Sequence, residues 1–272
     1  MLKQFFFFGL CLSLASAAAW SAEPAPARKP VLFIVGDSTV NAGKSGPAMG
    51  WGDCIGRFFD KSKIDVRNKA VGGRSSRTFQ TEGLWDKILE ASNAGDFVLV
   101  QMGHNDGGPL DDTKRARGSI PGTGDESKEI DNPITKKKEV VHTYGWYMRK
   151  YVTDARAKGM TVIICSPVPH VPKDKVEPGA VEASRYVKWS AEIAKDQQAL
   201  FIDLNRNSMA HYAGMTPEDI KAKYFVAADN THSSSAGADL NALAVVEGIK
   251  TLKDCPLASF LLEKPDAPPQ RP

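Results

Sequence analysis

The chain has 272 residues, of which 42% are hydrophobic and 25% are charged, the balance of an ordinary globular protein. This length can bury one sizeable core, so we expect a single folded domain. The formal net charge of +3 is too small to indicate a nucleic-acid partner.

The first 22 residues are typical of a secretory signal peptide. Lys3 precedes an apolar stretch at 5–15, which is too short to span a bilayer as a stable helix, and small residues follow it. Cleavage after Ala19 or after Ala22 is compatible with this pattern. We therefore expect a secreted or periplasmic protein that has no membrane contact after cleavage.

Strand-length apolar runs alternate with helical segments along the rest of the chain. The predicted strands are 31–35, 66–71, 97–102, 160–165 and 200–204. The predicted helices are 50–62, 84–94, 139–158, 181–197 and 235–252. This alternation predicts a parallel sheet of about five strands, covered by helices on both faces. The domain is expected to span 30–262, between a Pro-rich linker at 23–29 and a disordered Pro-rich tail at 263–272.

One segment, 107–138, is polar, rich in glycine and proline, and without periodicity. A connection of this length inside a compact domain is usually functional or disordered. Lys114, Arg115 and Arg117 lie near its start, and three lysines at 136–138 close it. A solvated insertion and a substrate-covering loop fit these features about equally.

The cysteines indicate little disulfide bonding. Cys11 lies within the predicted signal peptide, which leaves Cys54, Cys165 and Cys255, so at most one disulfide is expected. Cys165 stands in an apolar run and is expected to be a buried thiol. Cys54 and Cys255 could pair. None of the three has a neighbouring base in the sequence, which argues against a cysteine nucleophile.

Four short patches carry the chemistry of a serine esterase. They are the segments 36–39 (GDST), 72–75 (GGRS), 103–106 (GHND) and 229–232 (DNTH). The first three follow predicted strands, and ligands of parallel sheets bind beyond the carboxyl ends of the strands. Ser38 is the predicted nucleophile, His232 its general base, and Asp229 the carboxylate that orients His232.

A tetrahedral intermediate also needs hydrogen-bond donors for its oxyanion. The candidates are the backbone amides of Ser38 and Gly73 and the side-chain amide of Asn105. A turn or a cap would explain Gly73 or Asn105 singly, but not all the patches at once.

These patches resemble the four conserved blocks of the SGNH (GDSL) hydrolases. Segments 50–53, 68–77, 103–107 and 144–167 are further similar to rhamnogalacturonan acetylesterases, and the resemblance runs from about 31 to 252. It implies a three-layer α/β/α flavodoxin-like fold and no metal or organic cofactor. It also implies that Ser38, Asp229 and His232 are catalytic, with Ser38, Gly73 and Asn105 forming the oxyanion hole.

For other polar residues near the patches, the sequence leaves two alternative roles to be weighed. Arg74 and Arg77 either meet uronate carboxylates or bind the protein's own acids. His104 either lines the cleft or is a hydrogen-bonded structural histidine. For Asp37 and Asp106 we favour local roles in shaping the turns over a carboxylate pair for glycoside hydrolysis. Serines 233–235 are expected to cap the last helix rather than to act as nucleophiles.

The sequence therefore predicts a monomeric carbohydrate esterase that removes acetyl groups from a plant cell-wall polysaccharide, with rhamnogalacturonan or pectin as the favoured substrate. The alternatives are a lipase or thioesterase and an acetylxylan esterase. The first two require an apolar acyl tunnel, whereas the loops here are polar. A catalytically silent polysaccharide-binding domain would be expected to have a broken triad.

Overall fold

The computed structural model describes residues 28–269, so the predicted signal peptide lies outside the described residues. Five parallel strands form the central sheet, in the order β2–β1–β3–β6–β7. They are β1 (Val31–Gly36), β2 (Asp65–Asn68), β3 (Phe97–Gln101), β6 (Thr161–Cys165) and β7 (Leu200–Ile202). The predicted parallel sheet is confirmed.

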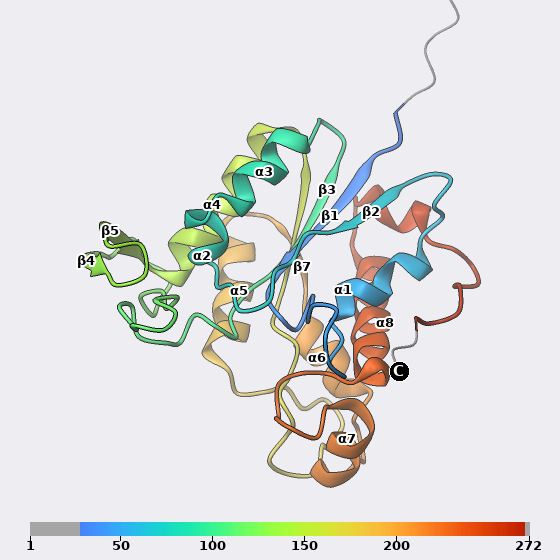
Figure 1. The fold of residues 1–272 in the computed structure, drawn as a ribbon. Helices are drawn as coiled ribbons and strands as arrows, with labels where there is room; N and C mark the ends of the chain where they lie inside the picture. The colour runs from blue at the N-terminus through green and yellow to red at the C-terminus, as the bar shows by residue number, and fades with distance from the viewer. Residues whose placement is uncertain (1–27, 270–272) are drawn as a thin grey trace, which may run out of the picture.

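Helices cover both faces of this sheet, as Figure 1 shows. One layer contains α1 (Trp51–Cys54), the 3₁₀ helix η1 (Ile55–Phe58), α8 (Ser235–Thr251) and the 3₁₀ helix η2 (Pro256–Phe260). The other contains α2 (Thr78–Thr81), α3 (Leu84–Ala91), α4 (Tyr144–Ala157) and α5 (Arg185–Asp196). Successive side chains of a strand point to opposite faces, so Leu32 and Phe33 of β1 belong to different cores. The three-layer α/β/α architecture is thereby confirmed.

Two short helices that the sequence did not predict follow β7. They are α6 (Leu204–Ala210) and α7 (Pro217–Tyr224), and they share a small third core with the segment around Val176. Thr216 caps α7 by accepting a hydrogen bond from the main chain of Asp219. No helix within residues 28–269 has both the length and the apolar character needed to cross a membrane.

The segment predicted as an unstructured loop contains a β-hairpin. Strand β4 (Ser127–Asn132) pairs antiparallel with β5 (Lys137–His142), so the helix predicted from 139 begins only at Tyr144. Thr143 caps that helix by accepting a hydrogen bond from the main chain of Trp146. The sequence did not predict the hairpin because its side chains are mostly polar and exposed. Ile130, Asn132 and Val141 are the buried residues of its strands.

Other predicted boundaries also shift. The helix predicted at 50–62 is the short α1 followed by η1, the helix predicted from 181 begins at Arg185, and β2 ends at Asn68. The predicted serine cap of the last helix is present: Ser234 caps α8 by accepting a hydrogen bond from the main chain of Gly237.

The predicted disordered tail is held against the domain as far as Asp266. The main-chain N–H of Asp266 donates to the carbonyl of Arg57 at 2.9 Å, and the Arg57 guanidinium donates back to the Asp266 carbonyl at 2.7 Å. Near the other end, Arg28 forms a 2.7 Å ion pair with Asp96. Residues 23–27 of the predicted linker and 270–272 of the tail lie outside the described residues.

The possible disulfide between Cys54 and Cys255 does not form. Cys255 is a buried free thiol, and so is Cys165. The Cys54 sulfur is buried and lies 3.5 Å from the sulfur of Met49. Burial raises the pKa of the Cys255 thiol, which disfavours the reactive thiolate.

Candidate active site

Ser38 lies in a tight turn at the carboxyl end of β1. The main-chain N–H groups of Val40 and Asn41 both donate to the Asp37 carbonyl, at 3.1 and 3.0 Å, which closes the turn. A Cβ atom at Gly36 would lie 2.3 Å from Val40 Cγ2, so a residue with a side chain does not fit there. The glycine of the Gly-Asp-Ser patch thus allows the turn that exposes Ser38.

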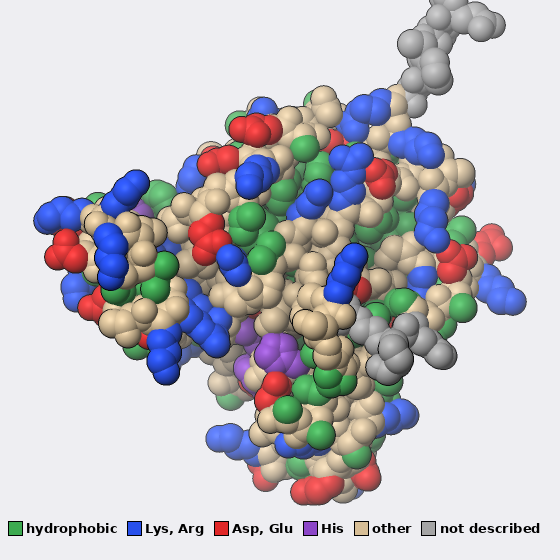
Figure 2. All heavy atoms as spheres, in the orientation of Figure 1, with side chains coloured by type: hydrophobic (Ala, Val, Ile, Leu, Met, Phe, Trp, Pro, Cys, Tyr) green, Lys and Arg blue, Asp and Glu red, His purple; other side chains and the backbone are tan. Residues whose placement is uncertain are grey.

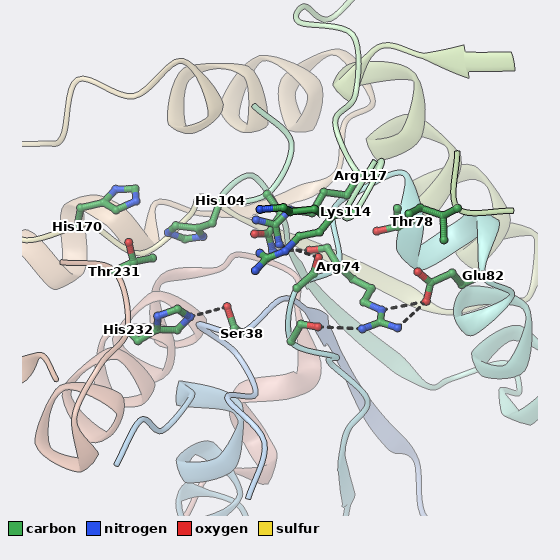
Figure 3. A pocket seen from close by; sticks show the side chains of 15 residues that line it. Ser38, Arg74, Thr78, Glu82, His104, Lys114, Arg117, His170, Thr231 and His232 are labelled. Atoms are coloured by element: carbon green, nitrogen blue, oxygen red, sulfur yellow. Dashed lines mark hydrogen bonds and ion pairs between the residues drawn. The ribbon is translucent and has the colours of Figure 1, made fainter. Parts of the chain in front are cut away.

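Ser38, His232 and Asp229 form a continuous chain of hydrogen bonds. His232 Nε2 lies 2.9 Å from Ser38 Oγ, and His232 Nδ1 lies 2.8 Å from Asp229 Oδ2 (Figure 3 shows the first contact). Asp229 Oδ1 also accepts the main-chain N–H groups of Thr231 and His232, at 2.8 and 2.7 Å. These contacts fix the turn that precedes α8 and aim the imidazole at the serine.

The charge state of Asp229 suits this arrangement. Partial burial would raise the pKa of the Asp229 carboxyl, but the hydrogen bonds from His232 and Thr231 outweigh burial and lower it. An ionised Asp229 keeps the proton of His232 on Nδ1, which leaves Nε2 as the acceptor for the serine proton.

The three predicted oxyanion donors surround the same space. Gly73 has φ +81°, a left-handed conformation that favours glycine. Within residues 28–269, no acceptor is bound to the backbone amides of Ser38 and Gly73. The Asn105 amide donates one N–H to the Arg74 carbonyl at 2.8 Å and has a second N–H available. These groups can supply an oxyanion with donors.

The triad opens into a polar pocket of about 710 Å³ that several loops enclose. Figure 3 shows the triad side of this pocket and its basic side together. Ile134, at the turn of the β4–β5 hairpin, is the one large hydrophobic side chain among the described residues of its lining. The lining comprises Ser38, Gly72, Gly73, Arg74, Thr78, Glu82, His104, Asn105, Lys114, Arg115, Arg117, Ile134, His170, Thr231 and His232.

Asp106 has the local role predicted for it. Its buried carboxylate accepts hydrogen bonds from the main chain and hydroxyl of Ser76 and, at 3.0 Å, from the hydroxyl of Ser119. Burial raises the pKa of Asp106 to about 6, although these hydrogen bonds oppose the shift. Asp106 therefore joins the loops that carry Gly73 and Asn105.

Asp37 and His104 are also local structural partners. Asp37 accepts the main-chain N–H and the hydroxyl of Thr39, at 2.9 and 2.7 Å. Its second oxygen contacts the His104 ring at 3.2 Å. His104 thus lines the pocket and is hydrogen-bonded within the protein, so both readings of this residue hold.

Arg74 and Arg77, for which the sequence left open a substrate contact or an ion pair within the protein, occupy different environments. Arg74 lines the pocket and forms a 2.9 Å ion pair with Glu82, with both side chains partly exposed. Arg77 is fully buried and bonds Glu139 at 2.7 Å. The prediction that Arg77 contacts substrate is wrong, because its guanidinium also donates to two main-chain carbonyls, those of Leu110 and Gly118.

Sequence reasoning did not assign the basic residues that do reach the pocket. Lys114, Arg115 and Arg117 come from the segment after β3, and His170 comes from the segment after β6. For Lys114, Arg115 and Arg117 the only signal in the sequence was three cations within four positions, and for His170 there was none. No group of three or more His, Cys, Asp or Glu side chains within residues 28–269 is arranged to hold a metal ion.

The sequence profile of the GDSL-like Lipase/Acylhydrolase family matches residues 34–240. This match spans most of the chain and contains the whole predicted site. The chain belongs to this family. The expected membership of the SGNH (GDSL) superfamily is thereby confirmed.

Curated relatives support the narrower resemblance. The chain is 29% identical to the rhamnogalacturonan acetylesterase of Emericella nidulans over 219 residues, covering 80% of the chain and 84% of the relative. It is 30% identical to the rhamnogalacturonan acetylesterase RhgT of Bacillus subtilis, covering 87% of the chain and 97% of the relative. The solved structure of YxiM from Bacillus subtilis, 25% identical, superposes with a TM-score of 0.64 over 83% of the chain, which spans 57% of YxiM.

Proposed function

We propose that the protein is a secreted carbohydrate esterase that removes acetyl groups from an acidic plant cell-wall polysaccharide, with rhamnogalacturonan as the favoured substrate. The observation that carries this proposal is the hydrogen-bond chain from Ser38 through His232 to Asp229, open to a polar pocket. The names of the relatives RhgT and the Emericella enzyme support the acetyl group and the polymer.

In the first step, Ser38 Oγ attacks the acetyl carbonyl carbon. His232 Nε2, 2.9 Å from the hydroxyl, accepts the serine proton as the new C–O bond forms. The imidazole becomes a cation, and the Asp229 carboxylate at 2.8 Å stabilises that charge.

The carbonyl oxygen becomes an oxyanion in the tetrahedral intermediate. The amides of Ser38, Gly73 and Asn105 donate hydrogen bonds to it, and each such donor is typically worth roughly 3–4 kcal/mol of transition-state stabilisation. Because Asp106 joins the loops that carry Gly73 and Asn105, these donors keep their relative positions without the substrate.

Collapse of the intermediate breaks the bond to the sugar. His232 gives its proton to the sugar oxygen, and the deacetylated sugar leaves with a hydroxyl group. A water molecule then attacks the acetyl-serine, again with His232 as the base. Acetate is released, and the proton returns to Ser38.

The lining of the pocket supports the proposal of a short acyl group. A lipase or thioesterase requires an apolar tunnel for its acyl chain, whereas Ile134 is the one large hydrophobic side chain among the described lining residues. An acetyl group requires little apolar surface, and the polar walls suit sugar hydroxyls.

Acetate release should be measured from acetylated rhamnogalacturonan fragments, from acetylated xylan, and from p-nitrophenyl esters of increasing acyl length. We expect the acetyl ester to be cleaved at least about tenfold faster than the octanoyl ester, and rhamnogalacturonan to be preferred over xylan. Faster cleavage of the octanoyl ester would overturn the proposal in favour of a lipase.

A further inference from the structure

Three cations of a single loop line part of the pocket. Lys114, Arg115 and Arg117 all line the pocket, and Figure 3 shows Lys114 and Arg117 extending toward its middle. In Figure 2, histidines lie in a hollow of the surface with basic side chains to one side of it. We call these three residues the basic wall.

The basic wall differs from the other arginines of the site in having no acidic partner. Arg74 is paired with Glu82 and Arg77 with Glu139. Within residues 28–269, none of the three cations of the wall takes part in an ion pair. Their charges are therefore available to an anion in the pocket.

Electrostatic interactions link two of the three cations. Burial and the positive charge of Arg115 lower the pKa of the Arg117 guanidinium, while the charges of Asp37, Asp112 and Asp106 act in the opposite direction. The like charges of Arg115 and Arg117 repel each other, and an anion bound between them relieves the repulsion.

Hydrogen bonds of the loop fix the backbone that carries the wall, whereas the side chains of Lys114 and Arg115 are exposed. The main-chain N–H groups of Arg115 and Ala116 donate to the Asp112 carbonyl, and Ser119 is bonded to Asp106. Ala116, between the two arginines, is buried and has φ +43°. A non-glycine residue in this conformation is strained and persists only where its surroundings fix it.

The wall begins beside the reacting group. Arg117 Nη1 donates to the Gly73 carbonyl at 3.1 Å, and the amide of Gly73 is the proposed oxyanion donor. An anion bound on the wall would therefore lie next to the acetylated sugar, within the same polymer chain.

We propose that Lys114, Arg115 and Arg117 form a subsite for the carboxylate of a uronate unit that neighbours the acetylated sugar. Guanidinium groups bind carboxylates in a bidentate manner, and a lysine adds a point charge. The hydroxyl groups of a neutral sugar would leave the three charges uncompensated. The inference rests on the proposed acetylesterase function and assigns the residues that select an acidic polymer.

The test compares acetylated rhamnogalacturonan fragments with the same fragments after carboxyl reduction, which removes the negative charges and retains the acetyl groups. The diagnostic variant is Lys114→Gln/Arg115→Gln, because Arg117 also holds the Gly73 loop. A matched control, Lys87→Gln/Lys195→Gln, removes two exposed charges from α3 and α5, and neither residue lines the pocket.

Wild-type protein and the control should have a higher kcat/KM on the acidic fragments than on the reduced ones. The diagnostic variant should lose about tenfold of this preference, mainly through KM, as expected for two charge pairs at a partly exposed site. Added salt should reduce the wild-type preference in the same way.

Two failures can be told apart. Acetate release from both fragments with no preference in the wild type, or an unchanged preference in the diagnostic variant, would overturn the carboxylate subsite and leave the esterase standing. No acetate release from either fragment by the wild type would overturn the proposed function itself, and the subsite with it.

Discussion

The Nδ1 of His104 lies 3.2 Å from the Oδ2 of Asp37, while the Nε2 of the same ring lies 3.0 Å from the carbonyl oxygen of Val168. Both partners are acceptors, and the pKa of His104 is raised, so the geometry favours an imidazolium whose two ring nitrogens both donate. Asp37 directly precedes Ser38, and His104 directly precedes Asn105. This buried ion pair therefore joins the nucleophile turn to the loop of an oxyanion donor.

The pKa of Asp37 is lowered and the pKa of His104 is raised, as an ion pair between them requires. Burial would raise the pKa of Asp37, but the charge and hydrogen bond of His104 and the bonds from Thr39 lower it below its ordinary 3.8. Burial would lower the pKa of His104, but the Asp37 charge and the hydrogen bonds to Asp37 and Val168 raise it above its ordinary 6.5.

Replacing His104 should therefore reduce stability in a pH-dependent way. The contribution of His104 is complete below pH 6.5 and is lost as the pH rises through its raised pKa. The contribution of Asp37 is complete above pH 3.8 and is lost as the pH falls through its lowered pKa. Between pH 3.8 and pH 6.5, denaturant unfolding should show that the free energy of unfolding of His104→Gln is roughly 3 kcal/mol lower than that of the wild type. An equal loss in clearly alkaline solution would show that the histidine packs as a neutral ring.

Asn105→Ala should impair chemistry rather than binding. If the Asn105 amide donates to the oxyanion, kcat should fall by roughly 10²–10³-fold with little change in KM, measured on a small acetyl ester. A defect confined to KM would make Asn105 a substrate-binding residue instead.

Comparing Gly73→Ala with Gly95→Ala should separate the loss of stability caused by backbone strain from the loss of kcat caused by a displaced oxyanion donor. Both glycines have positive φ, +81° and +86°, so each alanine should cost about 1–2 kcal/mol of stability. Gly95 precedes β3, outside the pocket lining, and should leave kcat unchanged. Gly73→Ala should lower kcat by about 10–100-fold, because it displaces an oxyanion donor. Equal kcat values for the two variants would remove Gly73 from the oxyanion hole.

Arg77 and Arg74 should respond differently to the same substitution. Arg77→Met leaves Glu139 without its buried partner and should cost about 3–5 kcal/mol of stability. Arg74→Met breaks a partly exposed pair with Glu82 and should cost less than about 1 kcal/mol. Thermal unfolding of the two variants provides the comparison. A stable Arg77→Met with a raised KM would restore Arg77 as a substrate contact.

The sequence predicted the sheet and the three residues of the triad, since Ser38 follows a buried apolar strand and Asp229 and His232 precede the last helix. The patch at 72–75 is less clearly marked, because it follows the partly exposed edge strand β2.

The sequence did not predict the β4–β5 hairpin, whose strands are too polar for a core pattern. Nor did it distinguish Arg77 from Arg117. That difference depends on partners distant in the chain, Glu139 for the first and Gly73 for the second. Such contacts leave no local signal.

The most direct test of the account is acetate release by Ser38→Ala from acetylated rhamnogalacturonan fragments, after circular dichroism has shown that the variant is folded. The account predicts that turnover falls by roughly 10⁴-fold or more relative to the wild type, because the serine oxygen that forms the acyl-enzyme is absent. A folded Ser38→Ala variant whose rate stays within about tenfold of the wild type would contradict the central claim.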